Sequence, residues 1–204
     1  MVELYLRGGV FMWPILALLV FGLAISLERL WTLSRASVKT RKFLGQIRDA
    51  LKTGGVKQAL ELCEKTRGPV AAIFHAGLLR ADRGLDQVEK AIVNAGSIEM
   101  AFLERGLVWL ATVVSVAPML GFLGTVWGMV TAFDAIAKAN DISPTIVADG
   151  ISQALLTTVF GLIVAIIMQA AHNFFVSRID RLVIDMEESS VDFIDALVEM
   201  EKTK

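Results

Sequence analysis

Three stretches of this sequence lack Asp, Glu, Lys and Arg altogether, and each is long enough to cross a membrane. They cover residues 8–27, 107–132 and 151–175. About twenty apolar residues in a helix cross a hydrocarbon core roughly 30 Å thick. The pattern therefore predicts an all-α, polytopic membrane protein with three transmembrane helices.

Between the first two stretches, apolar positions recur at the spacing of short amphipathic helices. Glycine and proline mark their ends, which predicts helices over 38–51, 56–65 and 70–80. A further helix, with Asp86 as its N-cap, continues into the second apolar stretch without an evident break. We expect a single helix there of about fifty residues, roughly 75 Å long.

The third apolar stretch is also expected to continue as a helix beyond the membrane. Its apolar positions follow a short heptad seam, which packs either on the chain's own polar helices or between copies of the chain. The seam consists of Ile179, Val183, Met186, Ser190, Phe193, Leu197 and Met200. The expected segments are the N-terminal segment and first span at 1–28, a small helical region at 29–106, the second span at 107–133, a link at 134–150, the third span at 151–176 and a C-terminal helix at 177–204.

The distribution of positive charge predicts the orientation of these segments. Residues 28–106 contain fourteen Lys and Arg against nine Asp and Glu, whereas residues 134–149 contain only Lys138 against three Asp. Lys and Arg concentrate in cytoplasmic loops. We therefore expect the small helical region and the C-terminus in the cytoplasm, the N-terminus and the link outside, and two helices that extend far into the cytoplasm.

Composition agrees with a membrane protein, because 55% of the residues are hydrophobic and only 20% are charged. The net charge of −1 says little about partners. Cys63 is the only cysteine, so no intrachain disulfide can form, and we expect a small buried side chain there. The sequence has no phosphate-binding loop, metal cluster or nucleophile paired with a base, so we expect neither an enzyme nor a metal, a cofactor or a nucleic-acid partner.

The second and third spans place small residues where a lipid anchor would use Leu and Ile. On the second span these are Pro118, Gly121, Gly124 and Gly128, and on the third they are Ala154, Gly161 and Ala165. Helices associate in lipid through close packing at small residues. Both stripes are therefore predicted helix-packing surfaces, whereas the first span is expected to face lipid.

Hydroxyl groups mark one level of these two spans. Thr125 and Thr158 each lie about eight residues from the outer end of their span, so antiparallel packing places both some 12 Å deep. With Gln153 and Thr157 they form a candidate polar ion pathway. Alternatively, each threonine hydroxyl returns to a carbonyl of its own helix, which carries no function.

An ion pathway for protons normally requires an ionisable group within the membrane. The only one in these spans is His172, near the predicted cytoplasmic end of the third span, where an interfacial or hydrogen-bonded role is expected. If protons cross here, another chain supplies the titrating acid.

Four motifs together resemble the MotA/TolQ/ExbB proton-channel family, and within it the ExbB and TolQ branch. They are M-W-P-I-L with the later S-L-E-R-L-W, then A-L-E-L-C-E-K-T-R-G-P, then G-L-V-W-L-A-T-V-V-S-V-A-P-M-L-G-F-L-G-T-V-W-G-M-V-T-A-F, and finally G-I-S-Q-A-L-L-T-T-V-F-G-L-I-V-A-I. The resemblance implies a homo-pentamer in the bacterial inner membrane. It also implies a single-span ExbD- or TolR-like partner that carries the membrane aspartate.

In the family, the second and third spans line a pore that contains two threonines, which correspond to Thr125 and Thr158. Two positions depart from the family pattern. Gln153 stands where ExbB and TolQ have Glu, and Ile167 stands where the family has Pro. The first departure replaces a carboxylate near the outer mouth of the pore with a neutral amide.

The resemblance implies a motor subunit that converts proton motive force into mechanical work outside the inner membrane. Which process it drives is left open by the sequence. A non-conducting membrane scaffold and a sodium-driven motor of the same class are the alternatives. A metabolite transporter is less consistent, because three spans offer no inverted repeat or broken helix pair for a binding site.

Overall fold

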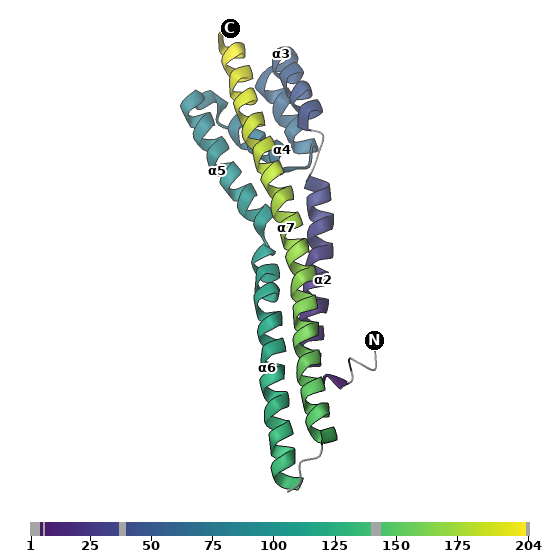
Figure 1. The fold of residues 1–204 in the computed structure, drawn as a ribbon. Helices are drawn as coiled ribbons and strands as arrows, with labels where there is room; N and C mark the ends of the chain where they lie inside the picture. Colours follow the sequence, from purple (N-terminus) through teal and green to yellow (C-terminus); the bar gives the residue numbers. More distant parts are fainter. Residues whose placement is uncertain (1–4, 6, 37–39, 140–143, 203–204) are drawn as a thin grey trace. The chain divides into compact units, whose positions relative to one another are not determined.

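The computed structural model describes residues 5, 7–36, 40–139 and 144–202, and within these ranges it contains no strand. This confirms the all-α prediction. The elements are α2 (Met12–Ala36), α3 (Thr40–Lys65), α4 (Pro69–Leu78), the 3₁₀ helix η1 (Ala81–Arg83), α5 (Leu85–Glu104), α6 (Leu107–Ala139) and α7 (Pro144–Lys202) (Figure 1). Three helical stretches are long and apolar enough to cross a membrane, namely Met12–Ser34, Leu85–Lys138 and Val147–Met200.

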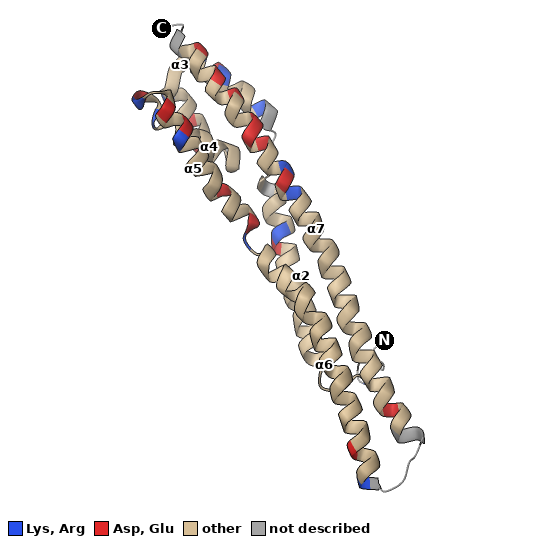
Figure 2. Ribbon diagram, turned by 60° about the vertical axis from the view of Figure 1, so that its left-hand side comes forward, with Lys and Arg blue, Asp and Glu red and all other residues tan. Residues whose placement is uncertain are grey.

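The chain divides into two compact units. Unit 1 comprises Met1–Arg29 and Gly106–Phe174, and unit 2 comprises Leu30–Arg105 and Phe175–Lys204. The continuous helices α2 and α7 each contribute residues to both units. Charged side chains are rare on α6 and on the first half of α7, and frequent on the later part of α7 (Figure 2).

Unit 1 is built on the antiparallel pair of α6 and the first half of α7. Gly128 on α6 lies against Ala154 on α7, and further along α6 the side chain of Ala132 lies against Gly150. Residue numbers rise along one helix as they fall along the other, so the two helices run in opposite directions. The first helix also packs on α7, since a Cβ at Gly22 of α2 would lie only 2.4 Å from the Met168 sulfur.

Unit 2 is a small helical core that includes the last part of α7. Gly55 breaks α3 into two helical pieces with φ 66°, as the Gly-Gly pair predicts. The rings of Phe43 and Phe74 stack at 5.9 Å, and those of Phe74 and Phe193 at 4.3 Å. Since Phe193 belongs to α7, the C-terminal helix packs on α4 of its own chain at this point.

The buried stripe of the C-terminal helix differs from the predicted heptad at three positions. Leu182 and Ser189 are buried, whereas their neighbours Val183 and Ser190 are only partly buried, as is Met200. The buried positions from 179 to 193 still alternate in steps of three and four residues, the spacing of a heptad seam. The period was therefore predicted correctly, and two positions of the seam lie one residue earlier than expected.

The predicted fifty-residue helix is wrong, because the chain leaves helical geometry between α5 and α6. Arg105 has φ −55° and ψ 129°, and Gly106 has φ 92°. A positive φ is accessible to glycine without a steric penalty. The start of α5 also differs from the prediction. Its N-cap is Gly84, while Asp86 lies in the first turn and accepts a 2.8 Å hydrogen bond from Lys90.

Candidate functional site

The contact between α6 and α7 in unit 1 is a backbone contact made possible by glycine. A Cβ at Gly161 would lie 2.6 Å from the carbonyl oxygen of Ala117, and a Cβ at Gly121 would lie 2.9 Å from that of Thr157. A Cβ at Gly124 would lie 2.6 Å from the Thr157 hydroxyl oxygen. Any larger side chain would force the helices apart, so these glycines set the distance between them.

At this contact the hydroxyls of Thr125 and Thr158 bond to each other across the two helices. Thr125 Oγ1 also lies 3.0 Å from the carbonyl oxygen of Ala154 and 3.2 Å from that of Gly121. Thr158 Oγ1 lies 3.2 Å from the Gly121 carbonyl oxygen. The structure thus brings together the two threonines that the sequence places at one level.

Each hydroxyl has a single hydrogen, which limits how this pair can be bonded. If Thr125 donates to Thr158, then Thr158 donates to the carbonyl of Gly121. If Thr158 donates to Thr125, then Thr125 donates to the carbonyl of Ala154 or of Gly121. The pair therefore has two directions of donation. Both side chains are half-buried, so a group beside the seam can reach them.

Thr157 differs from this pair, because it lies inside the seam and is only 1% exposed. Its hydroxyl is 2.7 Å from the Ala154 carbonyl oxygen and 3.2 Å from that of Gly121. Three hydroxyls thus converge on two backbone carbonyls. The sequence gives no signal for these acceptors, since every residue carries a carbonyl and only the glycine approach exposes Gly121 to the other helix.

Gln153 lies apart from the hydroxyls. It is about 140° around the helix from Thr158 at 100° per residue. A Cβ at Gly9, which has φ 71°, would lie 1.9 Å from Nε2 of Gln153, so its amide faces the N-terminal segment. Among the remaining predicted packing residues, Ala165 is buried in unit 1 and Pro118 is half-buried inside α6.

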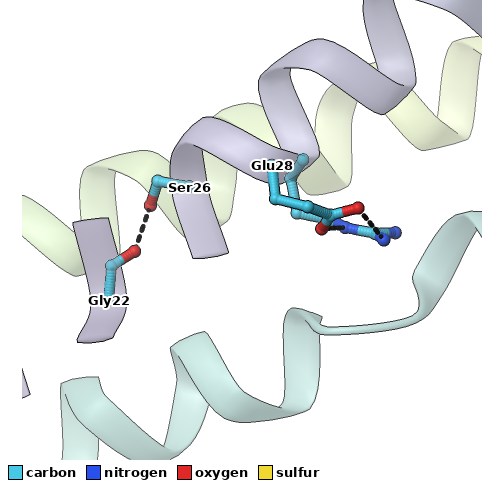
Figure 3. Close-up of polar contacts among 4 residues, drawn as sticks. Gly22, Ser26 and Glu28 are labelled. Atoms are coloured by element: carbon cyan, nitrogen blue, oxygen red, sulfur yellow. Dashed lines mark hydrogen bonds and ion pairs between the residues drawn. The ribbon is translucent and has the colours of Figure 1, made fainter. Parts of the chain in front are cut away.

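Three ionisable side chains of unit 1, His172, Arg29 and Glu28, lie near the end opposite the 134–150 link. Nδ1 of His172 is buried and has no hydrogen-bond partner among the described residues. Arg29, only 5% exposed, makes a two-bond ion pair with Glu28 at 2.6 and 2.8 Å (Figure 3). The same close-up shows Ser26 donating to the carbonyl of Gly22 on α2.

The burial of Arg29 was not foreseen from the sequence. An arginine at the end of a span is usually read as an interfacial group. Here its guanidinium packs on Gly106, where a Cβ would lie 3.5 Å from Arg29 Nε. The sequence feature that could have predicted this contact is Gly106, a glycine that separates two helices immediately before a span.

Comparison with known proteins gives a consistent match. Residues 65–188 match the MotA/TolQ/ExbB proton channel family. The chain is 35% identical over 179 residues to a biopolymer transport ExbB homolog of Methanothermobacter thermautotrophicus, covering 87% of this chain and 63% of that protein. It is 29% identical over 183 residues to the biopolymer transport protein ExbB of Pseudomonas putida, covering 81% of this chain and 54% of that protein.

A third relative is the Tol-Pal system protein TolQ of Pseudomonas aeruginosa. It is 38% identical over 125 residues, which cover 56% of this chain and 54% of that protein. The chain therefore spans just over half to just under two thirds of the length of these three relatives.

Proposed function

Because the chain belongs to the MotA/TolQ/ExbB proton channel family, we propose that it is the channel-wall subunit of a proton-driven motor in a bacterial inner membrane. In this proposal it acts without catalysing a covalent reaction. Its partner is a single-span ExbD- or TolR-like protein whose membrane carboxylate takes up and releases the proton. The work is delivered by the partner to a process on the outer side of the membrane.

The observation that carries the proposal is the bond between Thr125 and Thr158 at the seam of α6 and α7. A hydroxyl can donate to a carboxylate and can accept from a protonated carboxyl group. The pair has two directions of donation, so it can serve both states of a partner carboxyl. Neither threonine carries the proton through its own ionisation, since the hydroxyls only position the group that does.

The apolar surface around this pair favours movement of the partner helix when the carboxyl group of that helix is neutralised. Phe122 and Val126 are exposed apolar side chains on α6, and Leu155 and Leu162 are exposed on α7. A charged carboxylate is expensive beside such a surface, whereas a protonated one is tolerated. One charge that crosses 100 mV releases about 2.3 kcal/mol, comparable with a few hydrogen bonds. This energy is enough to bias a helix between two rotational positions.

The proposed arrangement has five copies of the chain around the partner helices. The N-terminal segment and first span occupy 1–28, and the second and third spans occupy 107–133 and 151–176. The N-terminus and the 134–150 link lie outside, and the 29–106 region and the C-terminus lie in the cytoplasm. The charge asymmetry of the loops supports this orientation. A cysteine-accessibility scan with a membrane-impermeant thiol reagent tests it, and labelling of the 134–150 link only in broken cells would contradict it.

Substitution of Thr158 by Val tests the function. Valine has nearly the same shape but no hydroxyl, so we expect normal assembly with the partner. The partner carboxyl group would lose a hydrogen-bond partner, which typically costs enough free energy for a tenfold change, so we expect at least a tenfold loss of proton flux in proteoliposomes. Thr158→Ser keeps the hydroxyl and should retain most of the flux.

Unchanged proton flux and unchanged motor output in Thr158→Val, with assembly intact, would contradict the role given to the threonine pair. The absence of proton flux through the unmodified, assembled complex would favour the non-conducting scaffold. A local hydroxyl bond such as that of Thr157 to the Ala154 carbonyl is what a scaffold would need. Flux that requires sodium in the buffer would instead identify the sodium-driven class.

A further inference from the structure

Unit 2 contains a cavity of about 550 Å³ that the proposed motor cycle does not use. It opens between the end of α2, the turn that joins α3 to α4, and the last turns of α5. Its apolar wall includes Cys63, Ala71, Ala72, Phe102 and Leu103. Cavities of this size with a few convergent polar groups are typical small-ligand sites.

Charges of both signs line the same cavity. The turn between α3 and α4 contributes Thr66 and Arg67. Two carboxylates also line the cavity, Glu64 at the end of α3 and Glu99 on α5, and His75 Nε2 lies 3.6 Å from Glu64 Oε1. A ligand that carries both an anionic group and a cationic group would match these charges.

The turn also offers the start of α4 to an anion. The N-cap Gly68 provides no side-chain bond to the first turn, and Pro69 follows it. The amide hydrogens of the first turn give this end of a helix a partial positive charge. Together with the Arg67 guanidinium, it makes this side of the cavity suited to a phosphate.

The cavity lies directly beyond the end of a candidate membrane span. Thr32 and Ala36 line it, and on the continuous helix α2 they lie about one and two turns beyond residue 28, where the first span is proposed to end. Phe102, which lines the cavity, is 51% exposed, and Ile98 one turn earlier on α5 is 69% exposed. α5 ends at Glu104, and the charge-free stretch of α6 begins three residues later. Along α2 and along the chain from α5 to α6, the residues that line the cavity are thus separated from the apolar spans by only a few residues.

We propose that this cavity binds the headgroup of a zwitterionic phospholipid with a primary ammonium, of the phosphatidylethanolamine type. The phosphate lies toward Arg67 and the start of α4, the ammonium toward Glu99 and Glu64, and the glycerol and upper acyl chain along Ala72 and Phe102. An anionic lipid without an amine would leave both carboxylates facing negative charge. A choline headgroup has no N–H group to donate to them.

The raised pKa of the Glu99 carboxyl group agrees with this assignment. Partial burial raises the pKa of its carboxyl group above the usual value for a glutamate. An ammonium placed beside it would offset that cost by stabilising the charged form. The proposal is independent of proton conduction, so its failure leaves the motor assignment untouched.

The test uses the full chain, purified in detergent and depleted of lipid. Dioleoyl lipids with ethanolamine, choline or glycerol headgroups are added separately, and affinity is taken from the shift in thermal unfolding with lipid concentration. We expect the ethanolamine lipid to bind at least about tenfold more tightly than the other two, as a charge-assisted bond would provide.

Matched variants locate the site. Glu99→Gln and Arg67→Gln should each weaken binding of the ethanolamine lipid about tenfold, and Glu99→Asp should restore most of it. Glu89→Gln on the exposed face of α5 and Arg80→Gln in the turn between α4 and η1 make the same charge changes outside the cavity and should bind as the unmodified chain does.

Three results would overturn the proposal. The first is equal stabilisation by all three lipids. The second is unchanged binding in both cavity variants while their helix content and oligomeric state are normal. The third is full competition by soluble glycerophosphoethanolamine at the same concentration as the lipid, which would assign the cavity to a soluble ligand.

Discussion

At the scale of single residues, the two threonines were predictable and their acceptors were not. Thr125 and Thr158 lie at equal distances from the link between their spans, so antiparallel packing alone brings them to one level. The Gly121 carbonyl that completes the cluster belongs to the backbone, so no residue type in the sequence identifies it as an acceptor. Gln153 is in the same sequence motif as Thr158, yet the helical rotation turns it toward Gly9.

Cys63 gives a prediction about reactivity. Burial raises the pKa of its thiol to about 12. The thiolate is the reactive form, so only about one thiol in ten thousand is ionised at pH 8. We expect iodoacetamide to label the folded chain far more slowly than the chain unfolded in denaturant. Labelling at equal rates would show that the Cys63 thiol is not buried and that its pKa is not raised.

Glu99 gives a prediction about pH. Because the pKa of its carboxyl is raised on folding, the folded state binds more protons than the unfolded state between the usual carboxyl pKa and the raised one. The contribution of Glu99 to stability therefore increases as the pH falls through this window and is lost as the pH rises through the folded pKa.

Glu99→Gln should remove this dependence and raise the stability of the lipid-free chain at pH 7. Thermal unfolding measured from pH 4 to pH 8 would detect the change, with Glu89→Gln as the exposed control on the same helix. A variant that is less stable than the unmodified chain at pH 7 would contradict the stated cause.

At the scale of helices, the glycines of the seam were recognisable as a packing stripe, but the break before α6 was not. The apolar periodicity of α5 runs into that of α6 without a change of phase, so periodicity alone predicts one helix. The break depends on the conformation of Gly106, whose φ of 92° is a property of the folded backbone. A single glycine in a helical pattern is often tolerated.

Gly161→Ala tests the seam. Its Cβ would lie 2.6 Å from the Ala117 carbonyl oxygen, which belongs to backbone and cannot turn away. We expect a loss of about 1–3 kcal/mol, the usual cost of overpacking, measured by unfolding in mixed detergent. Gly45→Ala in α3 is the control, since no atom lies within 4 Å of its Cβ and helix propensity favours alanine. Equal changes in stability for the two variants would mean that α6 and α7 are not closely packed at Gly161.

At the scale of the whole molecule, the C-terminal helix could be predicted as a continuation of the third span but its packing could not. A heptad seam is compatible with packing inside one chain or between copies. The ring of Phe193 on that of Phe74 decides in favour of contact within the chain at this point. Such a choice depends on where α4 lies, which no local pattern in α7 specifies.

Phe193→Ala tests that packing. Phe193 is 1% exposed, and its removal leaves a cavity against Phe74, so we expect a loss of about 3–5 kcal/mol. Because the contact is within one chain, the loss should not depend on protein concentration. Val191→Ala, on the exposed face of the same helix, should cost less than 1 kcal/mol. A loss that disappears at high protein concentration would place the contact between subunits.

The glycine contact between α6 and α7 also determines which parts can move during a working cycle. Where backbone touches backbone, there are no rotamers to exchange, so the two helices can shift only as one rigid body. A partner helix that turns against them meets a wall whose shape stays the same during the turn. In the proposed motor, the energy of each proton therefore goes into rotation of the partner and little is dissipated in deforming the wall.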